Sequence, residues 1–171
     1  MKSQTQNEEC DIVILNCNNK EDNILLSKIK KIAKDNEIDF KPGYAFELYT
    51  ACEYFFPDTS EFFFVAIKRD KNNELNDICG FARLTSGSRD DSSIILIETL
   101  ASKSYTNKLY KGVGTKLIKS IINYFKDDSN IAGIRVDSHP EAIDFYLKVG
   151  FERVGSSISR NLFISFDNLR N

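Results

Sequence analysis

The chain has 171 residues, 42% of them hydrophobic, which is enough to build one domain with a continuous core. We expect a polar N-terminal tail over residues 1–10 and a single domain over residues 11–171. The 23 basic residues nearly balance the 25 acidic ones, and the net charge of −2 gives no long-range attraction for a polyanion. The composition therefore predicts no nucleic-acid partner and no membrane partner.

The cysteines and the N-terminal segment indicate a cellular compartment. The chain has one histidine and no C-x-x-C pair, so we predict no metal site and four reduced thiols, at Cys10, Cys17, Cys52 and Cys79. The segment Met1–Glu9 is polar and lacks the apolar stretch of a signal peptide. These features predict a cytoplasmic protein.

The first half of the chain predicts a strand, two helices and three further strands. Asp11–Leu15 is rich in β-branched residues, whereas the apolar residues between Asp22 and Asn36 recur at helical spacing. The aromatic segment Tyr44–Phe56 predicts a short helix that ends before Pro57. Three extended runs then predict an antiparallel meander: Phe62–Lys68, Ile78–Leu84 and Ile94–Ala101.

The second half alternates between helices and strands. Apolar residues recur at helical spacing from Gly112 to Phe125, and Ile131–Val136 reads as a short strand. Ser138-x-x-Glu141 predicts a capping box, with Pro140 in the first turn of a helix that ends at Gly150. Two last strands, Phe151–Val154 and Leu162–Phe166, predict a hairpin.

A glycine turn before the strongest helix is a candidate anion site. Gly112 and Gly114 allow a close approach of the backbone, and Lys111 and Lys116 add positive charge near the free N–H groups of a helix start. The spacing matches neither a Walker A loop nor a dinucleotide fingerprint. The alternative is that the glycines only allow the chain to turn into the helix and bind no anion.

Three pieces in order resemble a known family. They are Ile97-Glu98-Thr99-Leu100-Ala101, Lys111-Gly112-Val113-Gly114-Thr115 and the FYLKVGF run that contains Tyr146. Together they resemble the GNAT superfamily of acyl-CoA-dependent N-acetyltransferases. The resemblance implies one α/β (α+β) domain, in which about four helices flank a mixed central sheet of about six or seven strands.

The resemblance also implies acetyl-CoA as the co-substrate, with no metal. In that family the backbone of one strand pairs with the pantetheine arm, and the glycine turn holds the pyrophosphate. Carried over to this chain, the cofactor-binding residues are Leu100, Ala101, Ser102, Leu109, Tyr110, Lys111, Gly112, Val113, Gly114, Thr115, Ser138 and Tyr146.

Acetyl transfer needs a base for the amine, donors for the developing oxyanion and an acid for the departing thiolate. We predict Tyr146 as the acid and Glu98 as the base, because Glu98 interrupts an otherwise apolar strand. The alternatives without a catalytic role are that Tyr146 is a core tyrosine and that Glu98 is a carboxylate that is solvated or paired with a lysine. A backbone N–H near Leu100 is the candidate oxyanion donor, and we interpret His139 as structural.

The predicted function is transfer of an acetyl group from acetyl-CoA to a primary amine of a small molecule or protein, by a monomer or homodimer. A non-catalytic acyl-CoA-binding module of the same fold is the alternative. A protein-interaction domain without a cofactor is a third possibility, and it requires a purely structural turn over residues 112–115. The acceptor pocket is recognised by shape, so the sequence does not identify the acceptor.

Overall fold

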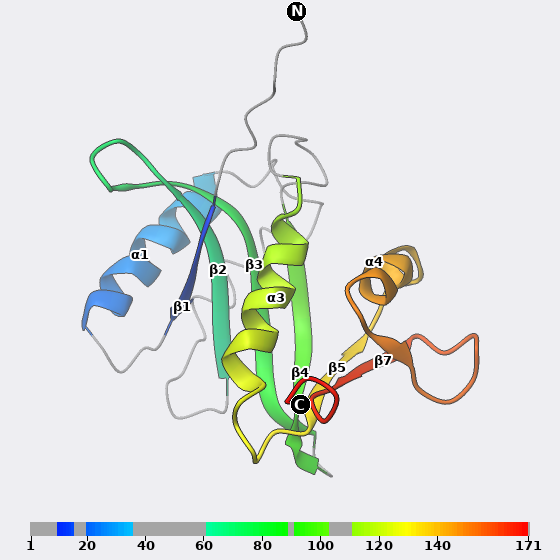
Figure 1. Cartoon of the computed structure of the whole chain (residues 1–171). Coiled ribbons are helices and arrows are strands. Elements are labelled where there is room, and N and C mark those ends of the chain that lie inside the picture. The colour runs from blue at the N-terminus through cyan, green and yellow to red at the C-terminus, as the bar shows by residue number, and fades with distance from the viewer. Residues whose placement is uncertain (1–9, 16–19, 36–60, 89–90, 103–110, 171) are drawn as a thin grey trace, which may run out of the picture.

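The computed structural model describes residues 10–15, 20–35, 61–88, 91–102 and 111–170. Seven strands form one mixed sheet in the order β1-β2-β3-β4-β5-β7-β6 (Figure 1). The strands are β1 Asp11–Leu15, β2 Glu61–Arg69, β3 Leu75–Ser88, β4 Asp91–Ser102, β5 Gly133–Asp137, β6 Glu152–Arg153 and β7 Asn161–Ser165. The helices are α1 Lys20–Asp35, α3 Val113–Phe125 and α4 Ile143–Lys148, with a 3-10 turn, η4 Pro140–Ala142, before α4.

The sheet has an antiparallel half and a half reached by a crossover. β1 to β4 pair with their neighbours in antiparallel fashion, as the predicted meander requires. α3 then carries the chain to β5, which pairs parallel to β4. β7 pairs antiparallel with both β5 and β6, which confirms the predicted hairpin. The single mixed sheet of seven strands is therefore confirmed.

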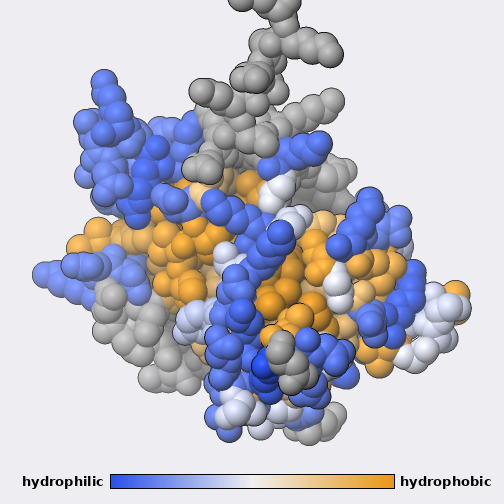
Figure 2. All heavy atoms as spheres, in the orientation of Figure 1, coloured by the Kyte–Doolittle hydropathy of each residue, from blue (hydrophilic) through white to orange (hydrophobic). Residues whose placement is uncertain are grey.

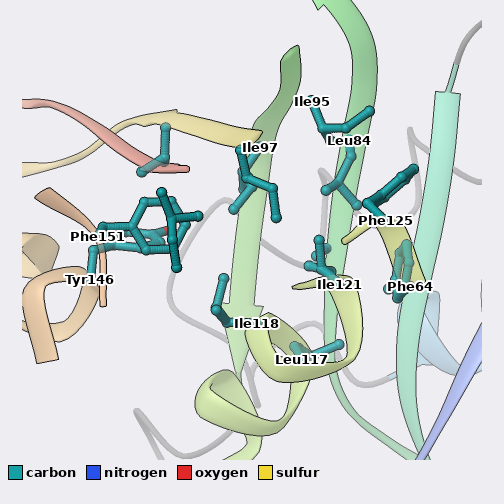
Figure 3. Close-up of a cluster of buried hydrophobic side chains, with 14 of the residues drawn as sticks. Phe64, Leu84, Ile95, Ile97, Leu117, Ile118, Ile121, Phe125, Tyr146 and Phe151 are labelled. Atoms are coloured by element: carbon teal, nitrogen blue, oxygen red, sulfur yellow. The ribbon is translucent and has the colours of Figure 1, made fainter. Parts of the chain in front are cut away.

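The two faces of the sheet carry separate apolar cores, because side chains alternate along each strand. We call them the α3 face and the α1 face. Phe64 and Ala82 pack with α3, whereas their neighbours Phe63 and Phe81 pack with α1. Figure 3 shows the α3 face, where Leu117, Ile118 and Ile121 of α3 lie among side chains of the strands.

α3 is the amphipathic helix that the sequence predicted. Its buried residues recur at a spacing of three or four, and its other side is lysine-rich and exposed. Figure 2 shows this hydrophilic side as a stripe with hydrophobic surface on both sides of it. α3 therefore covers the middle of its face of the sheet.

Some predicted details differ or lie outside the described residues. The predicted helix Tyr44–Phe56 is outside them, so the described chain contains three of the expected four helices. The capping box is wrong, since the N-cap of η4 is His139 and Ser138 Oγ instead donates to the His139 carbonyl oxygen at 2.8 Å. In the described part of the chain, no helix is both long and apolar enough to cross a membrane.

The prediction of four reduced thiols is wrong for two of them, because a disulfide joins Cys10 and Cys79. Cys79 lies at a register shift, where Gly80 pairs with Ala66 but Ile78 pairs with Ile67. The side chain of Cys79 thereby joins Cys10 in the core of the α3 face, across β2. The pair is 69 positions apart in sequence, which explains why spacing gave no sign of it.

The buried side of α3 allows a direct test of the core. Ile118→Ala removes a side chain with 0% exposure, so we expect the free energy of unfolding to fall by about 2–5 kcal/mol. Ile158→Ala is the matched control, since Ile158 is 85% exposed and should change stability by less than about 0.5 kcal/mol. Equal urea midpoints for the two variants would contradict this packing.

Candidate functional site

The site is built around the place where β4 and β5 part. Their parallel pairing begins at Ile94 with Gly133 and ends at Ile97 with Val136. From Glu98 to Ser102, β4 keeps β3 as its neighbour on one side, but no described strand pairs with its other edge. Figure 1 shows β5 and β7 turning away from β4 toward α4. The separation leaves open backbone groups along one edge of β4.

A bulge in β4 marks the point of separation. Leu84 pairs with Ile97 and Arg83 pairs with Thr99, so Glu98 is the extra residue on β4. A bulge bends its strand and increases the local twist, which turns β4 away from the direction of β5. A cavity of about 120 Å³ lies at this gap, and its lining residues are Ile97, Glu98, Thr99, Leu100, Val136, Asp137, Ser138, His139, Ala142 and Tyr146.

Tyr146 enters the cavity from α4, on the α3 face. Its side chain is only 5% exposed and packs edge-on against the ring of Phe151, at 5.4 Å between centroids (Figure 3). The ring of Phe145 packs against it in the same way, at 5.1 Å. The packed rings restrict its orientation, so the phenol is held in one place at the cavity wall. The short helix α4 and the turn at Gly150 bring Phe151 back onto Tyr146.

Glu98 reaches the same cavity from the α1 face. Its side chain is exposed, and its Oε1 accepts a hydrogen bond from Thr85 Oγ1 at 3.0 Å. The hydroxyl fixes one carboxylate oxygen and leaves the other available. The structure therefore brings the two predicted catalytic residues to one cavity, from opposite faces of the sheet.

The predicted strand contacts divide between the cavity and the core. Leu100 lines the cavity, whereas Ala101 is buried in the core of the α1 face and can offer only its backbone. Ser102, half-buried, ends β4. The predicted contacts Leu109 and Tyr110 lie outside the described residues.

The start of α3 has the features of an anion site. Gly112, the N-cap, has φ 87°, a backbone conformation that favours glycine, and no side chain caps the helix. No acidic residue stands in the first turn, and the first helical N–H with a backbone partner is that of Lys116, which donates to the Gly112 carbonyl oxygen. The N–H groups of Val113, Gly114 and Thr115 have no acceptor among the described residues.

Close packing fixes this helix start beside the open edge of β4. A Cβ on Gly80 of β3 would lie 2.7 Å from the Ala101 carbonyl oxygen and 3.0 Å from Val113 Cγ1. A Cβ on Gly114 would lie 3.2 Å from the ring of Phe145 in α4. The glycine turn therefore lies between β4 and the helix that carries Tyr146.

The two lysines near this turn have different surroundings. Lys111 is exposed, as a residue at the rim of an anion site must be. Lys116 instead directs its Nζ to the carbonyl oxygen of Cys10, so its charge is held at the start of β1.

Residues directly after β5 complete the cavity. Ser138 is buried, and its hydroxyl donates a hydrogen bond to the carbonyl oxygen of His139 in the turn after β5. His139, which we interpreted as structural, is exposed and lines the cavity together with Asp137. The sequence pointed to Ser138 through its match to a cofactor-binding position of the family, and to His139 as the one histidine of the chain.

Comparisons with known proteins agree on the fold. A family model described as an acetyltransferase (GNAT) domain matches residues 58–167. No curated protein sequence matches this chain. Among solved structures, AtaTR bound with AcCoA has 16% identity and a TM-score of 0.67, covering 95% of this chain and 97% of that chain.

Two further structures are similar. A tyrosine-to-phenylalanine mutant of KacT has 14% identity and a TM-score of 0.65, covering 95% of this chain and 98% of that chain. An acetyltransferase of the GNAT family from Staphylococcus aureus has 18% identity and a TM-score of 0.54, covering 91% and 99%. At these identities the likeness concerns the fold alone.

The prediction of no nucleic-acid partner is contradicted. Two similar structures are complexes with DNA: a KacTA–DNA complex, with a TM-score of 0.57, and an AtaT–AtaR complex bound to DNA, with a TM-score of 0.52. The prediction used net charge, which averages over the chain and says nothing of a local surface or of an assembly.

The family model matches residues 58–167, which is well over half of the chain. This chain therefore belongs to the GNAT acetyltransferase family.

Proposed function

We propose that this protein transfers the acetyl group of acetyl-CoA to a primary amine. The observation that carries the proposal is the cavity between β4 and β5, which a phenol lines from one face of the sheet and a carboxylate from the other. Family membership favours this reaction class, and the cavity supplies the groups that the reaction needs.

The described residues fit acetyl-CoA at three points. The N–H groups at the start of α3, which have no acceptor among the described residues, suit a pyrophosphate. The edge of β4 that no described strand covers suits the amide groups of pantetheine, and the cavity suits the thioester. Lys111 to Thr115 hold the pyrophosphate in this proposal. The similar structure of AtaTR contains AcCoA, which supports the same co-substrate here.

The proposed chemistry is direct transfer. The neutral amine attacks the thioester carbonyl carbon, and the developing oxyanion accepts a hydrogen bond from a backbone N–H near Leu100. Glu98 takes a proton from the amine, directly or through a water. The carbon–sulfur bond then breaks, and Tyr146 gives its proton to the thiolate. A phenol with a reference pKa of about 10 and a thiol of about 8.5 are close enough for this transfer.

The alternative is a module of the same fold that binds acyl-CoA without turnover. Both functions require CoA binding, whereas only the enzyme requires Glu98 and Tyr146 to act. The three variants below separate these requirements, because one addresses binding and two address chemistry.

Thr115→Glu tests the pyrophosphate site. Acidic residues in a first helical turn favour the helix, so folding should be preserved. The added carboxylate should occupy the free N–H groups and repel the phosphates, and CoA affinity in calorimetry should fall about tenfold or more. Thr115→Gln is the uncharged control of the same size. Equal affinities for both variants would place the phosphates elsewhere.

Tyr146→Phe tests the acid. The change keeps the packed ring, so stability and CoA affinity should change little. Positioned acid catalysis contributes about 100- to 10,000-fold, and single-turnover acetyl transfer should slow by an amount in that range. Tyr124→Phe loses a hydroxyl from a half-exposed ring on α3 and should not slow the reaction. A Tyr146→Phe rate within about threefold of wild type would assign thiolate protonation to another group.

Glu98→Gln tests the base. The rate should fall most at low pH, where most of the acceptor amine is protonated and removal of its proton limits attack. His139→Gln is the companion variant, because His139 lines the same cavity. A pH–rate profile that shifts only in the histidine variant would transfer the role from Glu98 to His139.

A further inference from the structure

Arg83 lies in the middle of β3, on the face of the sheet from which Glu98 enters the cavity. Its neighbours Ala82 and Leu84 are buried under α3, so strand alternation puts the Arg83 side chain on the α1 face. It pairs with Thr99, which lines the cavity, and with Phe63 of β2. The guanidinium is therefore one strand away from the proposed reaction site.

This guanidinium has a buried nitrogen without a partner. The residue is half-buried, its Nε is inaccessible to solvent, and no hydrogen bond or ion pair to Arg83 occurs among the described residues. An arginine remains charged at every relevant pH, and an unsatisfied buried donor on a charged group is costly. The other guanidinium nitrogens of Arg83 are not among the buried unpartnered atoms, so they are the donors that an anionic ligand could reach.

Arg83 and Glu98 carry opposite charges on adjacent strands, yet they do not pair. Thr85, two residues beyond Arg83 on the same strand face, donates to Glu98 Oε1 instead. Arg135, another arginine on this face, also has a buried Nε without a hydrogen-bond partner. Its charge, however, lies near Asp91, whose pKa is lowered first by hydrogen bonds from Ser93 and then by Arg135. Arg83 and Glu98 together thus present a separated cation and anion.

We infer that Arg83 binds an oxyanion carried by the acceptor, a carboxylate or a phosphate, while Glu98 faces the acceptor's amine. A planar guanidinium matches both kinds of oxyanion through paired N–H groups. The acceptor is then an amine that also carries a negative group. This inference rests on the proposed function, because it assigns the substrate class of the same cavity.

The first test compares matched amines with acetyl-CoA and measures kcat/KM from thiol release. The pairs are phenylalanine with phenethylamine, for the carboxylate, and phosphoethanolamine with ethanolamine, for the phosphate. Wild type should prefer the anionic member of one pair by about 10- to 100-fold, as expected for a charge-assisted hydrogen bond. The pair that shows the preference identifies the oxyanion.

Arg83→Gln should abolish that preference, because the neutral amide cannot replace the charged donors, and kcat/KM for the anionic amine should fall by about 10- to 100-fold. Arg83→Lys should keep part of the preference, since it retains the charge without the fork of donors. Lys119→Gln removes the same charge from the exposed side of α3 and should have no effect. A wild type without preference, or a preference that survives Arg83→Gln, overturns the inference.

A second test measures binding and does not need turnover. Acetate and inorganic phosphate are titrated into wild type and Arg83→Gln with CoA at saturation, at constant ionic strength. Wild type should bind one of these ions in calorimetry and Arg83→Gln should bind it at least tenfold more weakly. Equal binding, or none by wild type, overturns the assignment of Arg83.

Absence of CoA binding would instead refute the proposed function, and the ion titration of the free protein would still decide the role of Arg83.

Discussion

The site depends on the limited length of the backbone pairing between β4 and β5. Four residue pairs hold these strands together, and the pairing ends where Glu98 is inserted into β4. If the pairing continued, β5 would satisfy the edge of β4 and side chains would fill the gap. The bulge and the early end of β5 at Asp137 leave that edge without a partner among the described strands. The cavity, the open backbone groups and the position of α4 all follow from this separation.

The packing of α3 fixes the second part of the site relative to the first. Its apolar side fills the α3 face of the sheet, and the small residues Gly80 and Gly114 permit close contact with β4 and α4. The uncapped helix start therefore stays at the end of β4. The same interactions that stabilise the core keep the proposed phosphate site and the proposed thioester site in register.

The two faces of the sheet have different chemical character at the cavity. On the α3 face, Tyr146 lies among aromatic and aliphatic side chains. On the α1 face, Arg83, Thr85 and Glu98 form a polar group on β3 and β4. In the proposed reaction, the acid and the base thus work in separate environments, so they do not neutralise each other.

The sequence by itself determined the strands, α3 and the glycine turn, because local periodicity records which side of each element is buried. It also pointed to Glu98 and Tyr146, through a charge in an apolar strand and a motif after β5. Only the tertiary structure decided that Cys10 meets Cys79, that Ser138 does not form a capping box, and that Arg83 lacks a partner beside Glu98. The disulfide and the surroundings of Arg83 depend on strand register, including the shifts at Cys79 and Glu98. Register is set by the packing of residues far apart in the chain, and a one-residue shift changes which side chains share a face.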